Sequence, residues 1–131
     1  TTLFRSKIFI RGRMANHSMI KGKLVLVPFP FDDLSSDKLR PAVCLTNPIG
    51  SHHHVVLAFI TSRIPDEVLE TDIVIDSKRD DFSITGLHVS SAVRLHRLMT
   101  VTTSLIQREI GNLSSQMEVE VSEKLPKLFE Y

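Results

Sequence analysis

The chain has 131 residues, of which 42% are hydrophobic and 24% are charged, which is typical of a soluble globular domain and not of a disordered chain. Its 16 basic and 15 acidic side chains nearly balance. Charge neutralisation of phosphates dominates binding to nucleic acid. The balance therefore excludes a protein that coats nucleic acid through a uniformly basic surface, and any RNA contact is expected at a local patch.

The N-terminal part differs from the rest in charge and pattern. Residues 1–21 contain five basic residues and no acidic one, and residues 1–19 show no clear hydrophobic period. We expect residues 1–19 to be a flexible or non-native extension, and residues 20–131 to form a single domain. Two alternatives for the extension stay open: a basic arm that contacts RNA or a second chain, and a short helix over Phe4–Ile10.

The single cysteine and the lengths of the apolar runs indicate the cellular compartment in which the protein is expected. Cys44 lies within the apolar run 42–45, which predicts a buried, reduced thiol and fits the cytoplasm. No apolar run approaches the ~18 residues that a membrane helix needs. We therefore expect a cytoplasmic protein with no membrane partner.

Short apolar runs separated by turn residues predict strands. These runs are residues 23–29, 41–46, 55–60, 71–75 and 86–95, followed by shorter segments at 98–101 and 105–110. Ser114 or Ser115 is expected to cap a helix, since Glu118 follows Ser115 in capping-box spacing. Pro126 is expected to end or kink that helix. The apolar residues of the helix fall near one face: Met117, Val121, Leu125 and Leu128. The order predicts a mostly antiparallel barrel that is closed or covered by one C-terminal helix.

A polar loop between the first two strands is the most conspicuous candidate site. It holds three acids, Asp32, Asp33 and Asp37, and it ends at Arg40-Pro41. Loops held between rigid strands commonly carry function. Pro41 also biases the residue before it towards extended backbone, so Arg40 is expected to be held in a defined direction.

Three segments of the chain resemble the PemK/MazF-like toxins of bacterial type II toxin–antitoxin systems. They are LVLVPFPF at 24–31 with KLRPAV at 38–43, VLAFITS at 56–62, and GLHVSSAVRL at 86–95 followed by Leu98 and 105–114. The resemblance implies a mainly β, SH3-like small barrel with one C-terminal helix, which forms a homodimer. It also implies a metal-independent endoribonuclease, an mRNA interferase that cleaves single-stranded RNA at short sequences. A cognate antitoxin would neutralise it, and DNA would be bound through the complex with that antitoxin.

Cleavage of RNA without a metal uses the neighbouring 2′-hydroxyl as nucleophile. The protein must accept a proton from that hydroxyl, donate one to the leaving 5′-oxygen and stabilise charge on the phosphoryl oxygens. Arg40 suits the last task, because a guanidinium is always charged and meets phosphate with two donors. Thr61, at the end of a predicted strand, can add a hydroxyl donor. The resemblance assigns catalytic roles to Arg40 and Thr61.

The proton acceptor has several candidates. Asp37 is the nearest acid to Arg40, with Asp32 and Asp33 as alternatives. Some family members have an arginine and an acid two residues apart on the later strand, where this chain has Arg94 and His96. Histidine titrates near neutral pH, so His96 is a further candidate for moving protons. Arg94 is expected either to bind RNA or to pair with an acid across the sheet.

Further predicted RNA contacts surround these residues. The full set of expected RNA-binding residues is Ser35, Ser36, Lys38, Ser62, Arg94 and His96. The run His52–His54 sits in a predicted turn without a supporting cysteine or acidic motif, so we expect a variable loop that contacts RNA and no functional metal site. No cofactor is expected.

Two other functions stay open from the sequence. The same barrel serves in gyrase-poisoning toxins as a non-catalytic inhibitor of a protein target. A relative that has lost activity would only bind its antitoxin. Arg40 and Thr61 favour the ribonuclease, whereas the acidic body of the chain and His96 give some weight to the other two.

Overall fold

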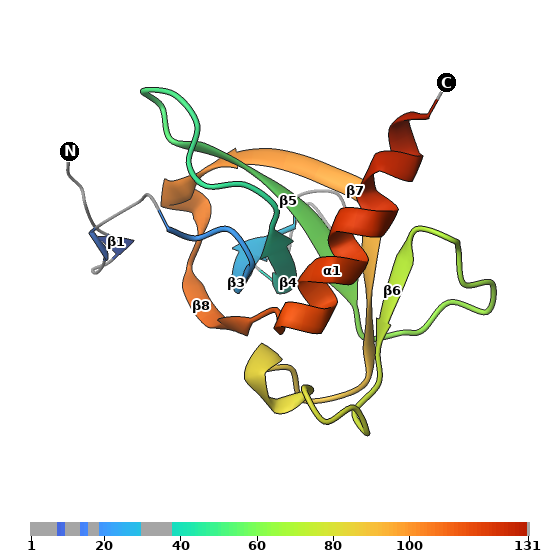
Figure 1. The fold of residues 1–131 in the computed structure, drawn as a ribbon. Helices are drawn as coiled ribbons and strands as arrows, with labels where there is room; N and C mark the ends of the chain where they lie inside the picture. Colours follow the sequence, from blue (N-terminus) through green and yellow to red (C-terminus); the bar gives the residue numbers. More distant parts are fainter. Residues whose placement is uncertain (1–7, 10–13, 16–18, 30–37, 131) are drawn as a thin grey trace.

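The protein is described by a computed structural model, which covers residues 8–9, 14–15, 19–29 and 38–130. Its main feature is a six-stranded antiparallel sheet in the order β6-β7-β5-β4-β3-β8 (Figure 1). The strands are β3 (Lys23–Pro28), β4 (Leu39–Cys44), β5 (His54–Thr61), β6 (Asp72–Ile75), β7 (Ser91–Thr102) and β8 (Arg108–Asn112). Two further strands, β1 (Ile8–Phe9) and β2 (Met14–Ala15), pair with each other outside this sheet.

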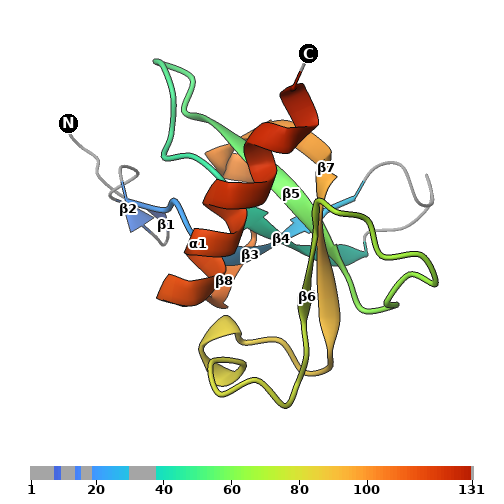
Figure 2. The same ribbon diagram turned by 45° about the vertical axis from the view of Figure 1, so that its right-hand side comes forward.

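The sheet curls into a half-barrel, and helix α1 (Ser115–Lys124) lies across one of its faces (Figure 2). Side chains alternate between the two faces along each strand, and this divides the core in two. One face is covered by α1, where Met117 is fully buried against Leu24, Val43 and Ile60. The opposite face carries a second cluster that includes Val25, Ala42, Leu57 and Phe59. Both faces of the central strands are thus apolar, which explains why these strands are almost continuous hydrophobic runs.

The predicted fold class is confirmed, with differences in the later strands. The strand expected from Gly86 begins only at Ser91, because residues Ser83–Thr85 form a 3₁₀ turn (η1) that ends at Gly86 with φ of +75°. From there β7 is one strand to Thr102, which includes the segment 98–101 expected to be separate. The helix alternative for the N-terminal segment is wrong at residues 8–9, which form β1.

Helix α1 begins as predicted, with Ser114 and not Ser115 as its N-cap. The Ser114 hydroxyl accepts a hydrogen bond from the backbone N–H of Met117 at 3.1 Å. The capping box expected from Ser115 and Glu118 is therefore wrong by one residue. Its predicted apolar face is confirmed, since Val121, Leu125 and Leu128 pack on the same cluster as Met117. The α-helix ends at Lys124 and a 3₁₀ turn, η3 (Leu125–Phe129), follows with Pro126 near its start.

Two glycines let turn η1 pack directly on β8. A Cβ on Gly86 would lie 1.9 Å from the carbonyl oxygen of Ile110, and a Cβ on Gly111 would lie 2.2 Å from that of Thr85. No side chain fits at such distances, so both positions require glycine. The contact holds the long connection between β6 and β7 against the opposite edge of the half-barrel.

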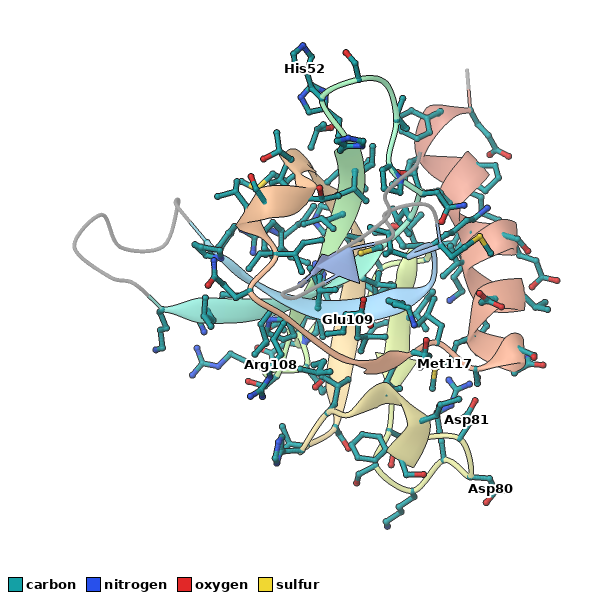
Figure 3. The ribbon with its side chains drawn as sticks, turned by 90° about the vertical axis from the view of Figure 1, so that its left-hand side faces the viewer. His52, Asp80, Asp81, Arg108, Glu109 and Met117 are labelled. Atoms are coloured by element: carbon teal, nitrogen blue, oxygen red, sulfur yellow. The ribbon has the colours of Figure 1, made fainter. Side chains whose placement is uncertain are left out.

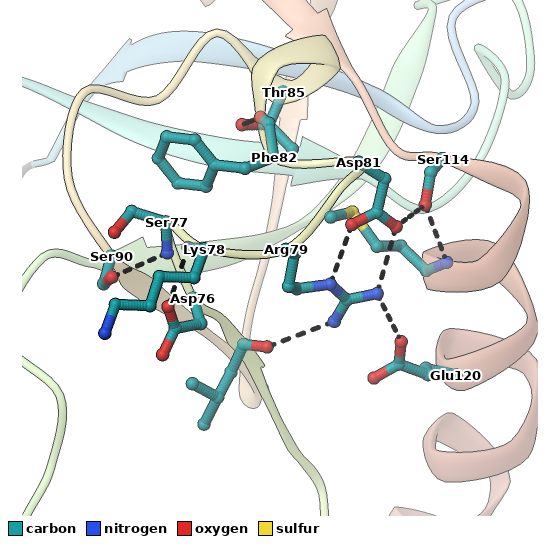
Figure 4. A network of polar contacts seen from close by, with 12 residues as sticks. Asp76, Ser77, Lys78, Arg79, Asp81, Phe82, Thr85, Ser90, Ser114 and Glu120 are labelled. Carbon is teal, nitrogen blue, oxygen red and sulfur yellow. Dashed lines mark hydrogen bonds and ion pairs between the residues drawn. The ribbon is translucent and has the colours of Figure 1, made fainter.

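A polar network fastens the same connection to helix α1 (Figure 4). Arg79 donates to the Asp81 carboxylate at 2.9 and 3.1 Å and to Glu120 of α1 at 2.9 Å. Ser114, the N-cap, donates to Asp81 at 2.5 Å. The arginine and the serine hydroxyl lower the pKa of Asp81 to about 2, and the two carboxylates raise the pKa of Arg79 further. The charged loop expected at 76–83 is therefore part of the scaffold.

Candidate functional site: an arginine-lined pocket

A pocket of about 210 Å³ opens where four neighbouring strands meet. Phe29 follows β3, Arg40 and Pro41 begin β4, and Phe59 to Ser62 end β5 and follow it, while β7 adds two arginines. Its lining residues are Phe29, Arg40, Pro41, Phe59, Ile60, Thr61, Ser62, Arg94 and Arg97. Three of these described residues are arginines and none is acidic. The pocket is therefore suited to an anion.

The strand register explains why these side chains meet. On β4, Arg40 lies two residues before Ala42, so both side chains point to the same face of the sheet. That face is opposite helix α1, which covers the side of Val43. Phe59 pairs with Arg94 across β5 and β7, so these two side chains point to that same face. Thr61, two residues after Phe59, follows them. Arg40 and Thr61 thus line one pocket on the side of the sheet opposite helix α1.

A bulge in β7 brings a second arginine into the pocket. The partner of Ala58 is Leu98, whereas the partner of the next residue, Phe59, is Arg94, so residues 95–97 have no partner on β5. Bulges of this kind redirect side chains and are common beside active sites. Arg94 and Arg97, three positions apart, consequently both line the pocket. In a regular strand the residue on the face of Arg94 would have been His96.

Arg94 is held from behind by a buried acid of the neighbouring strand. Nε of Arg94 lies 2.8 Å from a carboxylate oxygen of Asp72, whose side chain is fully buried. The other carboxylate oxygen of Asp72 accepts the backbone N–H of Leu69 at 2.8 Å, and its backbone carbonyl accepts Lys124 Nζ at 2.8 Å. The expected pairing of Arg94 with an acid across the sheet is confirmed. The same side chain also lines the pocket, so the two alternatives are not exclusive.

Thr61 presents its hydroxyl at the end of β5. Its Oγ1 accepts the backbone N–H of Arg63 at 3.1 Å. Because that bond occupies an acceptor position, the hydroxyl proton can be donated to an oxygen in the pocket. Ser62 lines the pocket beside it, whereas Arg63 is exposed and does not.

Two aromatic rings support the pocket below Arg97. The rings of Phe29 and Phe59 lie 4.3 Å apart between centroids, and both residues are buried. The guanidinium carbon of Arg97 lies 5.0 Å from the centroid of the Phe29 ring, which is a cation–π distance. Phe29 and Phe59 fall within the predicted strands 23–29 and 55–60, whereas Arg97 was not among the predicted site residues, because nothing in residues 94–97 indicates a bulge.

The other predicted site residues lie in several places. Lys38 is exposed immediately before β4, and His96 is exposed on β7; neither lines the pocket. The remaining candidates of the first loop lie outside the described residues: Asp32, Asp33, Ser35, Ser36 and Asp37. The pocket thus contains Arg40, Thr61, Ser62 and Arg94 from the predicted set, and the proposed proton acceptors are not among its described lining residues.

The histidine run and the cysteine lie apart from these features. His52 projects at the tip of the turn before β5 (Figure 3), and its ring centroid is 5.9 Å from that of His54. Among the described residues, no group of three histidine, cysteine, aspartate or glutamate side chains is arranged to hold a metal ion. Cys44 is buried, as predicted, and burial raises the pKa of its thiol to about 12. No helix in the described part is long and apolar enough to cross a membrane.

Structural comparison identifies several chains with this fold. The toxin MazF-mt6 of Mycobacterium tuberculosis superposes with a TM-score of 0.62 at 24% identity, over 82% of this chain and 95% of that one. MazF of Deinococcus radiodurans gives 0.63 at 19% identity, over 87% and 98%. A mycobacterial endoribonuclease solved in complex with its cognate antitoxin gives 0.62 at 12% identity, over 84% and 93%. At these identities the likeness establishes the fold.

Sequence comparison gives the family. No curated protein matches the chain. The profile of the family described as PemK-like, MazF-like toxin of type II toxin–antitoxin system matches residues 20–129. That range spans the whole six-stranded sheet, helix α1 and every residue that lines the pocket. The chain therefore belongs to the PemK-like, MazF-like toxin family.

Proposed function

We propose that the protein is a metal-independent endoribonuclease that cleaves single-stranded RNA at the arginine-lined pocket. The observation that carries the proposal is the charge of that pocket: Arg40, Arg94 and Arg97 line it with Thr61, and none of its described lining residues is acidic. A phosphodiester gains charge during 2′-hydroxyl attack, and fixed cationic donors stabilise such charge most where it develops.

The residues of the pocket take distinct roles in this proposal. Arg40 binds the phosphoryl oxygens through its planar fork, and Thr61 donates its hydroxyl to the same group. Arg94 lies on β7, and its Nε is paired with Asp72, so we assign its terminal amino groups to the same phosphate. RNA supplies its own nucleophile, so the protein contributes mainly orientation and charge.

Proton transfer is assigned to the first loop. Asp37 is the proposed acceptor, because it is the acid nearest in sequence to Arg40 and the described lining of the pocket contains no acid. His96 is exposed on the strand that carries Arg94, and we keep it as a contact for RNA outside the pocket. Ser35, Ser36 and Lys38 are proposed to contact the strand on either side of the cleaved bond.

The structural neighbours support a protein partner. They include a MazE–MazF complex of Deinococcus radiodurans and an endoribonuclease bound to its cognate antitoxin. We propose that an antitoxin likewise covers the pocket of this chain, that the active form is a homodimer in the cytoplasm, and that the complex with the antitoxin binds DNA.

The test uses the full chain, purified without an antitoxin, and a mixed-sequence single-stranded RNA in excess EDTA. The proposal predicts discrete cuts that leave 2′,3′-cyclic phosphate or the 3′-phosphate formed from it. Replacing the ribose on the 5′ side of a mapped cut with 2′-deoxyribose should abolish that cut, because the nucleophile is removed, while the strand still binds. The deoxy strand serves as the matched control for binding.

Two outcomes contradict the nuclease. One is RNA that stays intact with a folded protein that stops cell growth, which would favour inhibition of a protein target. The other is continued cutting at the 2′-deoxy position, which would exclude 2′-hydroxyl chemistry.

A further inference from the structure

Arg97 adds to the positive charge of the pocket, but the nuclease reaction proposed above assigns it no individual role. It lies in the bulge of β7, it is exposed, and its guanidinium lies over the Phe29 ring at 5.0 Å. Phe29 in turn packs on Phe59 at 4.3 Å. The Phe29 and Phe59 rings are inclined to each other at 44°, so the three side chains form a contiguous cluster that begins in the core and ends at the pocket. Among the described residues, no carboxylate pairs with Arg97.

Such a stack favours contact with a flat group. Arginine planes, like aromatic rings, are surfaces on which the bases of single-stranded RNA stack. The buried phenylalanines restrict the guanidinium before RNA arrives, so less side-chain entropy is lost on binding. A base could then lie on the exposed side of the Arg97 guanidinium, whose other side faces the Phe29 ring.

The position of the stack determines which base it meets. Arg40, Thr61 and Arg94 line the same pocket and carry the phosphate in the proposed function. Arg97 shares that pocket, so a base that contacts it belongs to a nucleotide directly beside the bound phosphate. We propose that Arg97, supported by Phe29, is a stacking subsite for an RNA base adjacent to the cleaved phosphodiester. The subsite rests on the proposed function, because it assumes that the pocket binds RNA.

Binding to strands that cannot be cleaved tests the subsite. The probes are a short single-stranded 2′-O-methyl oligonucleotide of mixed sequence and a strand of the same length and phosphate number without bases. Affinity for each is measured by fluorescence anisotropy with the protein, with Arg97→Lys and with Arg63→Lys. Lysine keeps the charge of position 97 and removes the planar group, while Arg63 is exposed near Thr61 but outside the pocket lining.

The expected result is a loss specific to the bases. Arg97→Lys should weaken binding of the base-carrying strand by roughly tenfold, since one stacked base contributes about that much. Its affinity for the abasic strand, and both affinities of Arg63→Lys, should match those of the unmodified protein. The abasic strand also controls for folding, because a misfolded variant would lose both strands.

Three outcomes overturn the subsite. The first is an equal loss of affinity for both strands in Arg97→Lys, which would indicate a phosphate contact or a packing role. The second is an Arg97→Lys protein that binds both strands as tightly as the unmodified protein. The third is an Arg63→Lys protein that loses as much affinity for the base-carrying strand as Arg97→Lys does. A protein that binds both strands but never cuts RNA would contradict the proposed nuclease activity. The base-specific loss of affinity in Arg97→Lys could still be measured, so the two proposals are tested separately.

Discussion

The carboxylate of Asp72 lies 2.8 Å from Nε of Arg94 and is itself fully buried, while the arginine side chain remains 20% exposed at the pocket. The acid is anchored by the Leu69 backbone N–H, and its own backbone carbonyl accepts a bond from Lys124 of the C-terminal helix. One residue of the edge strand β6 thereby contacts the pocket through its side chain and helix α1 through its backbone carbonyl. It sets the direction of an arginine that we assign to phosphate binding.

We expect the two members of this ion pair to respond differently to substitution. Arg94→Ala should lower the free energy of unfolding by about 3–5 kcal/mol, because it leaves the buried Asp72 carboxylate unpaired. Asp72→Asn should cost less, since the amide oxygen still accepts the Leu69 N–H and Arg94 is partly hydrated. Urea unfolding of both variants measures the difference. Equal costs would contradict the buried location of the charge.

Asp72→Asn should also slow cleavage without removing a group from the pocket. A guanidinium that is no longer fixed at Nε is less well oriented, and small errors in position cost roughly tenfold to a hundredfold. The effect should vanish when Asp72→Asn is added to Arg94→Gln, because Asp72 acts through Arg94. Single-turnover rates of the four proteins give this coupling. Full additivity would show that Asp72 affects the site by another route.

Thr61→Val keeps the shape of the side chain and removes its hydroxyl. We expect cleavage to fall by about 10²-fold, which is typical for loss of one donor to a developing oxyanion. Stability should change little, because the N–H of Arg63 that bonds the hydroxyl is exposed and can bond water instead. Thr61→Ser should retain most activity. A Thr61→Val enzyme as fast as the unmodified one would remove Thr61 from the reaction.

The network around Asp81 predicts a stability loss in acid. Its pKa is lowered from the ordinary value to about 2 by Arg79 and by Ser114, so the ionised form is favoured in the folded state. Its contribution is complete above the unfolded pKa of ~3.9 and disappears as the pH falls towards ~2. The melting temperature of Asp81→Asn should therefore lie below that of the unmodified protein at neutral pH, and the two should converge in acid. A difference that persists at the lowest pH would contradict the charge as its cause.

The Cys44 thiol should not react with alkylating reagents while the protein is folded. Its thiol is buried, and the pKa of about 12 leaves almost no thiolate at neutral pH. Alkylation by iodoacetamide at pH 8 should therefore proceed only through unfolding, and it should become fast in urea. Fast labelling without denaturant would show that β4 opens in the native state.

The sequence was informative wherever one local rule decided the structure. Apolar runs bounded by turn residues predicted strands β3 to β6, and the helical spacing of apolar residues predicted the buried face of α1. An ion pair of Arg94 with an acid across the sheet was one of the two roles expected for that residue. Arg40 and Thr61 were singled out because the family resemblance assigns roles to the arginine before this proline and to the threonine at this strand end. The sequence left Ser114 and Ser115 open as the N-cap because both offer a hydroxyl, and in the structure Ser114 is the one that bonds the Met117 N–H and Asp81.

The missed features depend on contacts between distant segments. The bulge at residues 95–97 arises from the pairing of β7 with β5, and it replaces His96 by Arg97 at the pocket. Asp72 falls within the predicted strand 71–75, and its burial depends on the packing of β6 against β7 and α1, which the sequence does not show. Gly86 and Gly111 lie far apart in the chain, so neither sequence position revealed that η1 packs on β8.

The most direct test of the pocket as the site of RNA cleavage compares an arginine inside the pocket with an arginine outside it. Arg40 lines it, whereas Arg63 is exposed and does not. The measurement is the single-turnover rate of cutting at one mapped RNA site in EDTA, for Arg40→Ala and Arg63→Ala proteins with unchanged melting temperatures. We predict a loss of at least about 10²-fold for Arg40→Ala and the full rate for Arg63→Ala. An Arg40→Ala protein that cuts at the unmodified rate would contradict the assignment of the pocket as the site of cleavage.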